Sequence, residues 1–328
     1  MWFYSNLVLF KILEQGVYLM KKFLKLFMPL GVIFLFIAAC SEKAAPTDSN
    51  QPKIVTSIFP MYEIVKEIAG NRAEVSLMVG ANEDAHHYEP SAQAVASVNE
   101  ADVFFYSSED MEFWVNRLLD VVENENLHIV EFSNGLNLKV GEPEHSENLD
   151  DHDHGNSDPH FWLNLQKVNK QLHLIVKALS EVDPEGSEYY QKNAEKFSSD
   201  LLALDQAYLE AFKDAENRMF VVQHQAFGHL ADRYNLEQVS VGGLSTELEA
   251  SPKVLAEIID FVKEQNVPVI YYQSGDYSAV AETIAKETNT EIAVLYDLES
   301  EPADINIVGN TYLEAMVQNL EQLKKSIQ

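Results

Sequence analysis

Short apolar runs typical of β-strands alternate with helical patterns along most of this 328-residue chain. In the first half, strands are expected over residues 53–58, 73–79, 102–106 and 127–132, and helices over 61–69, 92–99 and 113–122. In the second half, strands are expected over residues 219–223, 238–241, 267–272 and 292–296, and helices over 227–234, 252–265, 279–288 and 312–327. Alternation at this pitch predicts parallel sheets with helices on both faces.

A long helical segment separates the two halves. After a first helical stretch over residues 165–179, residues 187–213 place Tyr190, Ala194 and further apolar side chains at spacings of three and four. This periodicity predicts one helix of about 27 residues, roughly 40 Å long. We therefore expect an α/β fold with two lobes, each a parallel four-stranded β-α sheet, joined by one long rigid backbone helix. The expected boundaries are 52–184 for the first lobe, 185–215 for the backbone helix and 216–328 for the second lobe.

The N-terminal region has the features of an export signal. Basic residues after Met20 precede an apolar run over residues 26–37, which ends in Ala38-Ala39-Cys40. The run is shorter than the ~20 apolar residues that a spanning helix needs, so we predict a signal peptide over 1–39 with Met20 as the true start. Cys40 resembles the lipidated cysteine of bacterial lipoproteins, which implies a lipid anchor at the outer face of the cell membrane and a polar tether over 40–51. The alternative is an ordinary signal peptide with an incidental cysteine.

Charge and cysteine content limit the partners and the ligands. The chain has 52 acidic and 23 basic residues and a net charge of −29, which argues against nucleic acid and anionic headgroups as partners. Cys40 is its one cysteine, so any metal in the exported body must be held by His, Asp or Glu.

An acidic loop over residues 142–158 contains His145, His152 and His154 among many carboxylates. Imidazole and carboxylate groups are the usual ligands of zinc-like cations, so we expect this loop to bind such cations weakly. The alternative is a solvated acidic loop with incidental histidines.

Other potential ligands follow predicted strands. His86 and His87 follow the second strand, His160 follows the fourth, His224 closes the fifth, and Asp297 and Glu299 follow the last. Ligands of parallel sheets bind outside the carboxyl ends of the strands. A single histidine in such a place is more often a hydrogen-bonded loop residue, and we interpret His128, His173 and His229 in this way. Candidates from four strand ends in one cleft instead predict a closed tetrahedral site of three imidazoles and one carboxylate.

Several motifs resemble those of the metal-binding solute-binding proteins of bacterial ABC importers, in the zinc-type branch of the cluster A-I (cluster 9) family. They are His86-His87-Tyr88-Glu89-Pro90, Asp158-Pro159-His160-Phe161-Trp162-Leu163-Asn164, His224-Gln225-Ala226-Phe227 and Glu249-Ala250-Ser251-Pro252. The resemblance covers essentially the whole exported chain. It implies two β-α lobes linked by a rigid helix, with the metal site in the cleft between them.

The resemblance also implies the ligands. His86, which precedes Tyr-Glu-Pro by one residue, His160 and His224 match the three histidine ligands of the family, and the role of His87 stays open. Manganese-type relatives place an aspartate where this chain has Tyr296, whereas zinc-type members use a glutamate that matches Glu299. Asp297 or a water is the alternative fourth ligand. The acidic loop also resembles the metal-scavenging loop of the zinc branch.

The resemblance implies a lipid-anchored receptor, not an enzyme, that captures Zn²⁺ and delivers it to an ABC permease. The permease and ATPase are expected as separate chains, because the sequence has no GxxxxGK[ST] loop. We expect a monomer, and cation release through a rearrangement near the fourth ligand; an additional adhesion role stays open.

Three histidines favour zinc, with manganese as the alternative within the class. An exported zinc hydrolase is a second alternative, although the chain has no HExxH motif.

Overall fold

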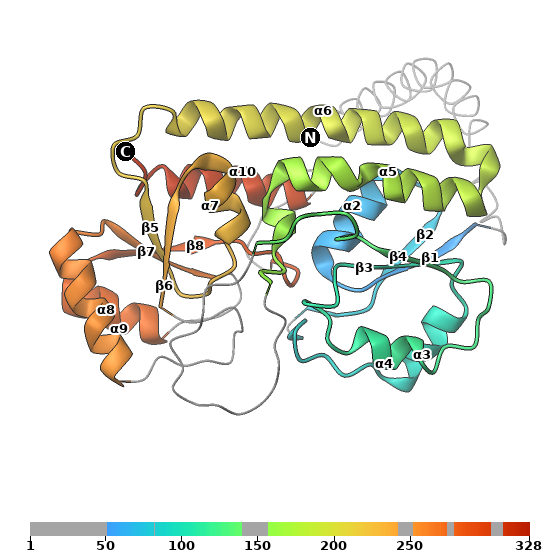
Figure 1. The fold of residues 1–328 in the computed structure, drawn as a ribbon, viewed down its shortest axis with the longest axis horizontal. Coiled ribbons are helices and arrows are strands. Elements are labelled where there is room, and N and C mark those ends of the chain that lie inside the picture. Colours follow the sequence, from blue (N-terminus) through green and yellow to red (C-terminus); the bar gives the residue numbers. More distant parts are fainter. Residues whose placement is uncertain (1–50, 82, 140–156, 242–251, 274–278, 303–310) are drawn as a thin grey trace, which may run out of the picture. The chain divides into compact units, whose positions relative to one another are not determined.

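Two parallel four-stranded sheets form the framework of the computed structural model (Figure 1). The structure describes residues 51–81, 83–139, 157–241, 252–273, 279–302 and 311–328. The strand order is β2-β1-β3-β4 in the first sheet and β6-β5-β7-β8 in the second. The predicted α/β class is therefore confirmed, and within the described residues no helix is long and apolar enough to span a membrane.

The first half of the chain contributes four strands and the helices that follow them. Its elements are β1 (Lys53–Thr56), α2 (Phe59–Ala69), β2 (Glu74–Leu77), α3 (Ala92–Asn99), β3 (Val103–Tyr106), α4 (Val115–Leu119) and β4 (His128–Glu131). The central strand β3, with sequence VFFY, is buried at every position. Parallel strands covered on both faces have such continuous apolar runs. In Figure 1, α2 and α5 lie on one side of this sheet, and α3 and α4 on the other.

Two helices connect the sheets in sequence. A short 3₁₀ helix, η1 (Phe161–Leu163), precedes α5 (Leu165–Val182), and η2 (Pro184–Gly186) precedes the long helix α6 (Ser187–Phe212). Asn164 caps α5, because its side chain accepts hydrogen bonds from the backbone N–H groups of Gln166 and Lys167. The predicted apolar stripe of α6 is buried against α2, α5, α7 and α10, so α6 contacts elements of both halves.

The second half repeats the β-α pattern. Its elements are β5 (Met219–Val222), α7 (Gly228–Tyr234), β6 (Glu237–Ser240), α8 (Pro252–Gln265), β7 (Val269–Gln273), α9 (Ala279–Thr288), β8 (Glu291–Leu295) and α10 (Thr311–Leu323). Helix α9 packs on β7 and β8, while α7 and α10 pack between this sheet and α6 (Figure 1). The segments that follow β2, β4, β5 and β8 hold the predicted metal ligands. The predicted lobe boundaries stay predictions.

Candidate metal centre

Four buried side chains from separate parts of the chain place their ligand atoms within 4.8 Å of one another. They are His86, His160, His224 and Glu299. Each follows a strand at its carboxyl end, directly or through a connecting loop, and two come from each half of the chain. The site therefore lies where parallel β-α sheets bind ligands, and all four residues were proposed from the sequence.

The carboxylate of Glu299 is the common neighbour of the three imidazoles. Its Oε1 lies 2.9 Å from Nε2 of His160 and 2.7 Å from Nε2 of His224, and its Oε2 lies 3.6 Å from Nε2 of His86. Nε2 of His86 is buried and has no hydrogen-bond partner among the described residues. A buried nitrogen without a partner is costly unless it binds something, so the group fits a cation ligated by three nitrogens and one oxygen.

Asp158 orients the ring of His160. Its Oδ1 accepts a hydrogen bond from the backbone N–H of His160 at 3.0 Å and lies 2.8 Å from Nδ1 of the same residue. Nδ1–H is thus directed to Asp158, and Nε2 is left to face the site, the arrangement typical of metal-binding histidines. This is the physical reason for the spacing in Asp158-Pro159-His160.

Helix α7 supports Asp158 from the second half of the chain. The ring of His229 donates from Nε2 to the backbone oxygen of Asp158 at 2.9 Å, while its Nδ1 accepts from Lys167 at 2.8 Å. A Cβ on Gly228 would lie 2.5 Å from Oδ2 of Asp158, so a larger residue there would push the carboxylate away. His229 is therefore not one of the four converging residues but supports His160 through Asp158, a role that no sequence motif indicated.

The loop before His86 is held by one aspartate and one tryptophan. Oδ1 of Asp84 accepts from the backbone N–H of His86 at 2.8 Å, and Nε1 of Trp114 donates to the oxygen of Ala85 at 3.0 Å. His87 is exposed, with its Nδ1 3.2 Å from Oδ2 of Asp84, and lies outside the group of four.

Glu299 and Asp297 occupy different positions relative to the three histidines, although they are two residues apart. Leu298 between them adopts a left-handed conformation with φ of 67°, and only Glu299 joins the three histidines. Asp297 is buried, its Oδ1 accepts from the backbone N–H of Glu299 at 3.3 Å, and its Oδ2 has no partner among the described residues. The geometry therefore favours Glu299 over Asp297 as the fourth ligand.

The electrostatics of the group follow from its burial and its close pairs. Burial opposes a charge on His160, but the hydrogen bonds to Asp158 and Glu299 outweigh it and raise the pKa of His160 to about 10. Burial likewise opposes a charge on Glu299, but His224, His160 and His86 hold its pKa well below the usual value. Burial and the charge of Glu299 raise the pKa of Asp297 to about 7. Glu299 is therefore the anionic member of the site.

The remaining histidines lie elsewhere. His128 is exposed on β4 and lies 3.3 Å from Glu181, and His173 is exposed on α5, where its Nδ1 donates to the oxygen of Lys170. The predicted loop residues His145, His152 and His154, the predicted lipidation site Cys40 and the motif residues Glu249–Ser251 lie outside the described residues.

Comparison with known proteins agrees with the metal site that the geometry indicates. The family described as zinc-uptake complex component A, periplasmic, matches residues 54–326. The chain is 36% identical over 314 residues to the high-affinity zinc uptake system protein ZnuA of Bacillus subtilis, covering 94% of this chain and 98% of that protein. It is 38% identical over 299 residues to the zinc-binding lipoprotein AdcA of Streptococcus pneumoniae, covering 89% of this chain but only 58% of AdcA.

Solved structures agree with these sequence relationships. The Zn(II)-bound ZnuA-like domain of S. pneumoniae AdcA matches with a TM-score of 0.72 and 36% identity, covering 84% of this chain and 99% of that chain. The laminin-binding protein Lmb of Streptococcus agalactiae, described as bifunctional with adhesin and metal-transporting activity, matches with a TM-score of 0.73 and 33% identity, covering 84% and 100%. The chain therefore belongs to the family of zinc-uptake complex component A proteins.

Proposed function

We propose that this protein is an extracytoplasmic receptor that binds Zn²⁺ through His86, His160, His224 and Glu299 and delivers it to an ABC permease. The observation that carries the proposal is the convergence of three buried imidazole Nε2 atoms on one buried carboxylate. Permease and ATPase are separate chains in this proposal, and Cys40 carries a lipid that holds the receptor at the outer face of the membrane. The zinc-binding and zinc-uptake names of its relatives support the same cargo.

The donor set distinguishes zinc from the alternatives. Three nitrogens and one oxygen suit Zn²⁺, whereas Mn²⁺ prefers more oxygen ligands. Four protein ligands also complete a tetrahedral shell and leave no position for the reactive water of a zinc hydrolase. The site therefore suits capture and transfer of a cation rather than catalysis.

The direct test is calorimetric titration of the exported body with Zn²⁺, followed by competition with Mn²⁺. We expect one tightly bound equivalent of Zn²⁺ that a hundredfold excess of Mn²⁺ does not displace. Displacement by Mn²⁺ would assign the protein to manganese, and absence of any tight equivalent would refute the proposed function.

Zinc binding is expected to release protons at neutral pH. Because the pKa of His160 is raised to about 10, its ring carries a proton on Nε2 below that pH, and Zn²⁺ must displace this proton. Affinity should thus rise as the pH rises from 6 to 8, by about tenfold per unit for each proton released. Titrations in two buffers of different ionisation enthalpy measure the number of protons, and an affinity that is constant over this interval would contradict the prediction.

Removal of residues 142–157 is expected to leave the tight site intact. The four proposed ligands lie outside this loop, so the tight equivalent should keep its affinity within about twofold, whereas weak equivalents should disappear. A variant with His145, His152 and His154 changed to Asn keeps the loop and serves as the control for the altered connection. Loss of the tight equivalent in both variants would place the loop in the primary site.

A further inference from the structure

We propose that Glu63, Tyr312 and Trp162 form a clamp of buried hydrogen bonds that ends at the backbone next to Glu299 and thereby sets the rate at which the bound cation leaves. The inference rests on the proposed function and goes beyond it, because none of these three residues belongs to the group of four ligands. They are positioning residues, which act on the cation through Glu299.

Trp162 holds the chain just before Glu299 and is itself held by Tyr312. Its indole Nε1 donates to the backbone oxygen of Asp297 at 2.6 Å, and its own backbone oxygen accepts from the hydroxyl of Tyr312 at 2.6 Å. All these groups are buried. One residue of η1 therefore fixes the chain two residues before Glu299, and Tyr312 of α10 fixes that residue in turn.

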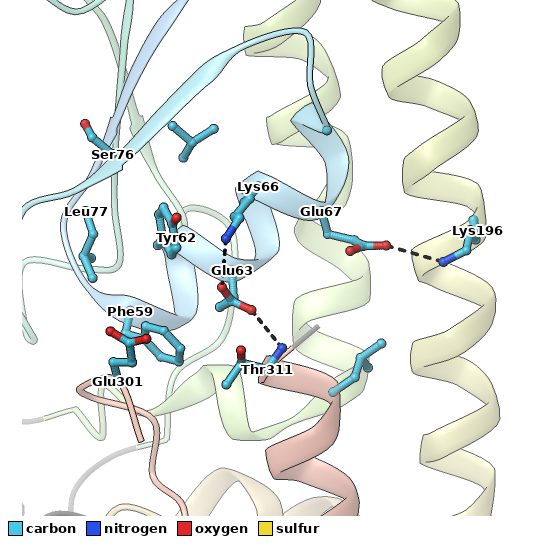
Figure 2. Close-up of a pocket in the computed structure, with 13 residues that line it drawn as sticks. Phe59, Tyr62, Glu63, Lys66, Glu67, Ser76, Leu77, Lys196, Glu301 and Thr311 are labelled. Atoms are coloured by element: carbon cyan, nitrogen blue, oxygen red, sulfur yellow. Dashed lines mark hydrogen bonds and ion pairs between the residues drawn. The ribbon is translucent and has the colours of Figure 1, made fainter. Parts of the chain in front are cut away.

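Glu63 holds the start of α10, next to Tyr312. It lies on α2 and is 6% exposed, and its Oε2 accepts from the backbone N–H of Thr311 at 2.9 Å. Thr311 is the first residue of α10, where a helix has free N–H groups and a partial positive charge that favour a carboxylate. Glu63 and Glu301 both line a cavity of about 940 Å³. Figure 2 shows the carboxylate of Glu63 directed at Thr311. Glu63 thus holds the end of α10 from which Tyr312 reaches Trp162.

Glu299 depends on these holds because its local support is weak. The hydrogen bond from its N–H to Oδ1 of Asp297 measures 3.3 Å, and Leu298 before it is left-handed. Its carboxylate is also the common neighbour of the three histidines. A shift of the segment would therefore withdraw the one oxygen ligand and leave three imidazoles, which hold Zn²⁺ less tightly.

The test compares variants that lose single bonds of the clamp. Trp162→Phe removes the indole donor and keeps an aromatic ring, and Tyr312→Phe removes only the hydroxyl. Loss of supporting partners of metal ligands costs about 10–100-fold in affinity. With the zinc-loaded protein and a fluorescent chelator in excess, we expect release about tenfold faster for Trp162→Phe and several-fold faster for Tyr312→Phe.

Tyr208→Phe is the matched control. Tyr208 is as buried as Tyr312, and its hydroxyl donates to the backbone oxygen of Met316 in the same helix α10. The control loses the same kind of buried bond without touching the segment of Glu299. Equal acceleration in Tyr208→Phe, or release at the wild-type rate in both clamp variants, would overturn the proposal.

Glu63 provides a rescue experiment. Glu63→Gln keeps an oxygen that can accept from Thr311, and Glu63→Leu does not. We expect Glu63→Leu to release zinc several-fold faster than Glu63→Gln, because the hold on Thr311 is lost only in the leucine variant. Equal rates would remove Glu63 from the clamp.

Two further readouts separate the clamp from the cargo and from general destabilisation. Hydrogen exchange of the Leu298–Glu301 amides should accelerate in both clamp variants in the absence of metal. This readout therefore tests the clamp even if the wild-type protein binds no zinc. Absence of zinc binding would refute the proposed function alone. With Co²⁺ in the site, a loosened Glu299 should admit water and weaken the visible absorption of the tetrahedral complex. Unchanged exchange and an unchanged Co²⁺ spectrum would show that Trp162 and Tyr312 do not position Glu299.

Discussion

Replacement of His160 by alanine is expected to weaken Zn²⁺ binding by roughly a hundredfold to a thousandfold. A four-ligand zinc site contributes about 10–16 kcal/mol, or about 3 kcal/mol for each ligand, and 1.4 kcal/mol corresponds to a factor of ten. His160 is fully buried, and its loss also leaves the carboxylates of Asp158 and Glu299 without their shared imidazole. The remaining three ligands cannot compensate, because His86 and His224 come from other segments with their own fixed positions.

Competition titration against a chelator of known affinity measures this loss. His173→Ala is the matched control, since His173 is exposed on α5 and donates only to the backbone oxygen of Lys170. The control should change the affinity by less than about twofold, because a surface substitution away from the site has little effect. Retention of wild-type affinity in His160→Ala would contradict the proposed ligand set.

The same titration identifies the fourth ligand. Glu299→Gln keeps the shape of the side chain and removes its charge. We expect a loss of affinity of about tenfold or more, because a charged partner contributes about 1.5–3 kcal/mol and 1.4 kcal/mol corresponds to a factor of ten. Asp297→Asn should have a smaller effect, because Asp297 lies outside the group of four. The opposite order would return Asp297 to the site as the oxygen ligand.

Much of the fold follows from local patterns in the sequence. Each of the eight strands and the helices expected from periodicity is present. The inner strands β1, β3, β5 and β7 show the apolar runs of parallel strands that are covered on both faces. The boundaries depend on particular residues. Helix α5 was expected to end at Leu179 but continues to Val182, since Pro184 disfavours helical conformation only at Asp183. The predicted helix over 113–122 is shorter, Val115–Leu119, after a loop whose N–H groups bond Glu112.

The site was predictable where strand ends determine it and unpredictable where distant packing does. His86, His160 and His224 follow strands, so the sequence could place them at one edge. The choice between Asp297 and Glu299 depends on the left-handed Leu298, which has no sequence signature. Bonds such as Glu63 to Thr311, 248 residues apart, depend on how the two halves pack. The supporting role of His229 was missed for the same reason.

Replacement of Asp205 by alanine is expected to lower the free energy of unfolding by about 3 kcal/mol, the low end for breaking a buried ion pair. Asp205 is 4% exposed on α6. It accepts from Arg233 at 2.8 and 2.6 Å, from Gln166 at 2.8 Å and from Tyr234 at 3.1 Å. These donors lie on α5 and α7, so the carboxylate joins three helices. The expected destabilisation lies at the low end of the range for buried ion pairs, because the Arg233 side chain is 29% exposed and can be hydrated after the change.

Denaturant unfolding of the two proteins measures the difference. Burial opposes the charge of Asp205, but Arg233 and Gln166 hold its pKa below the usual value, so its contribution should be present at neutral pH and be lost as the pH falls toward the acid range. Asp200→Ala is the control on the same helix: Asp200 is 45% exposed and pairs only one turn away with Lys196, so its loss should cost less than about 1 kcal/mol. Equal destabilisation by the two changes would show that the buried network does not hold α5, α6 and α7 together.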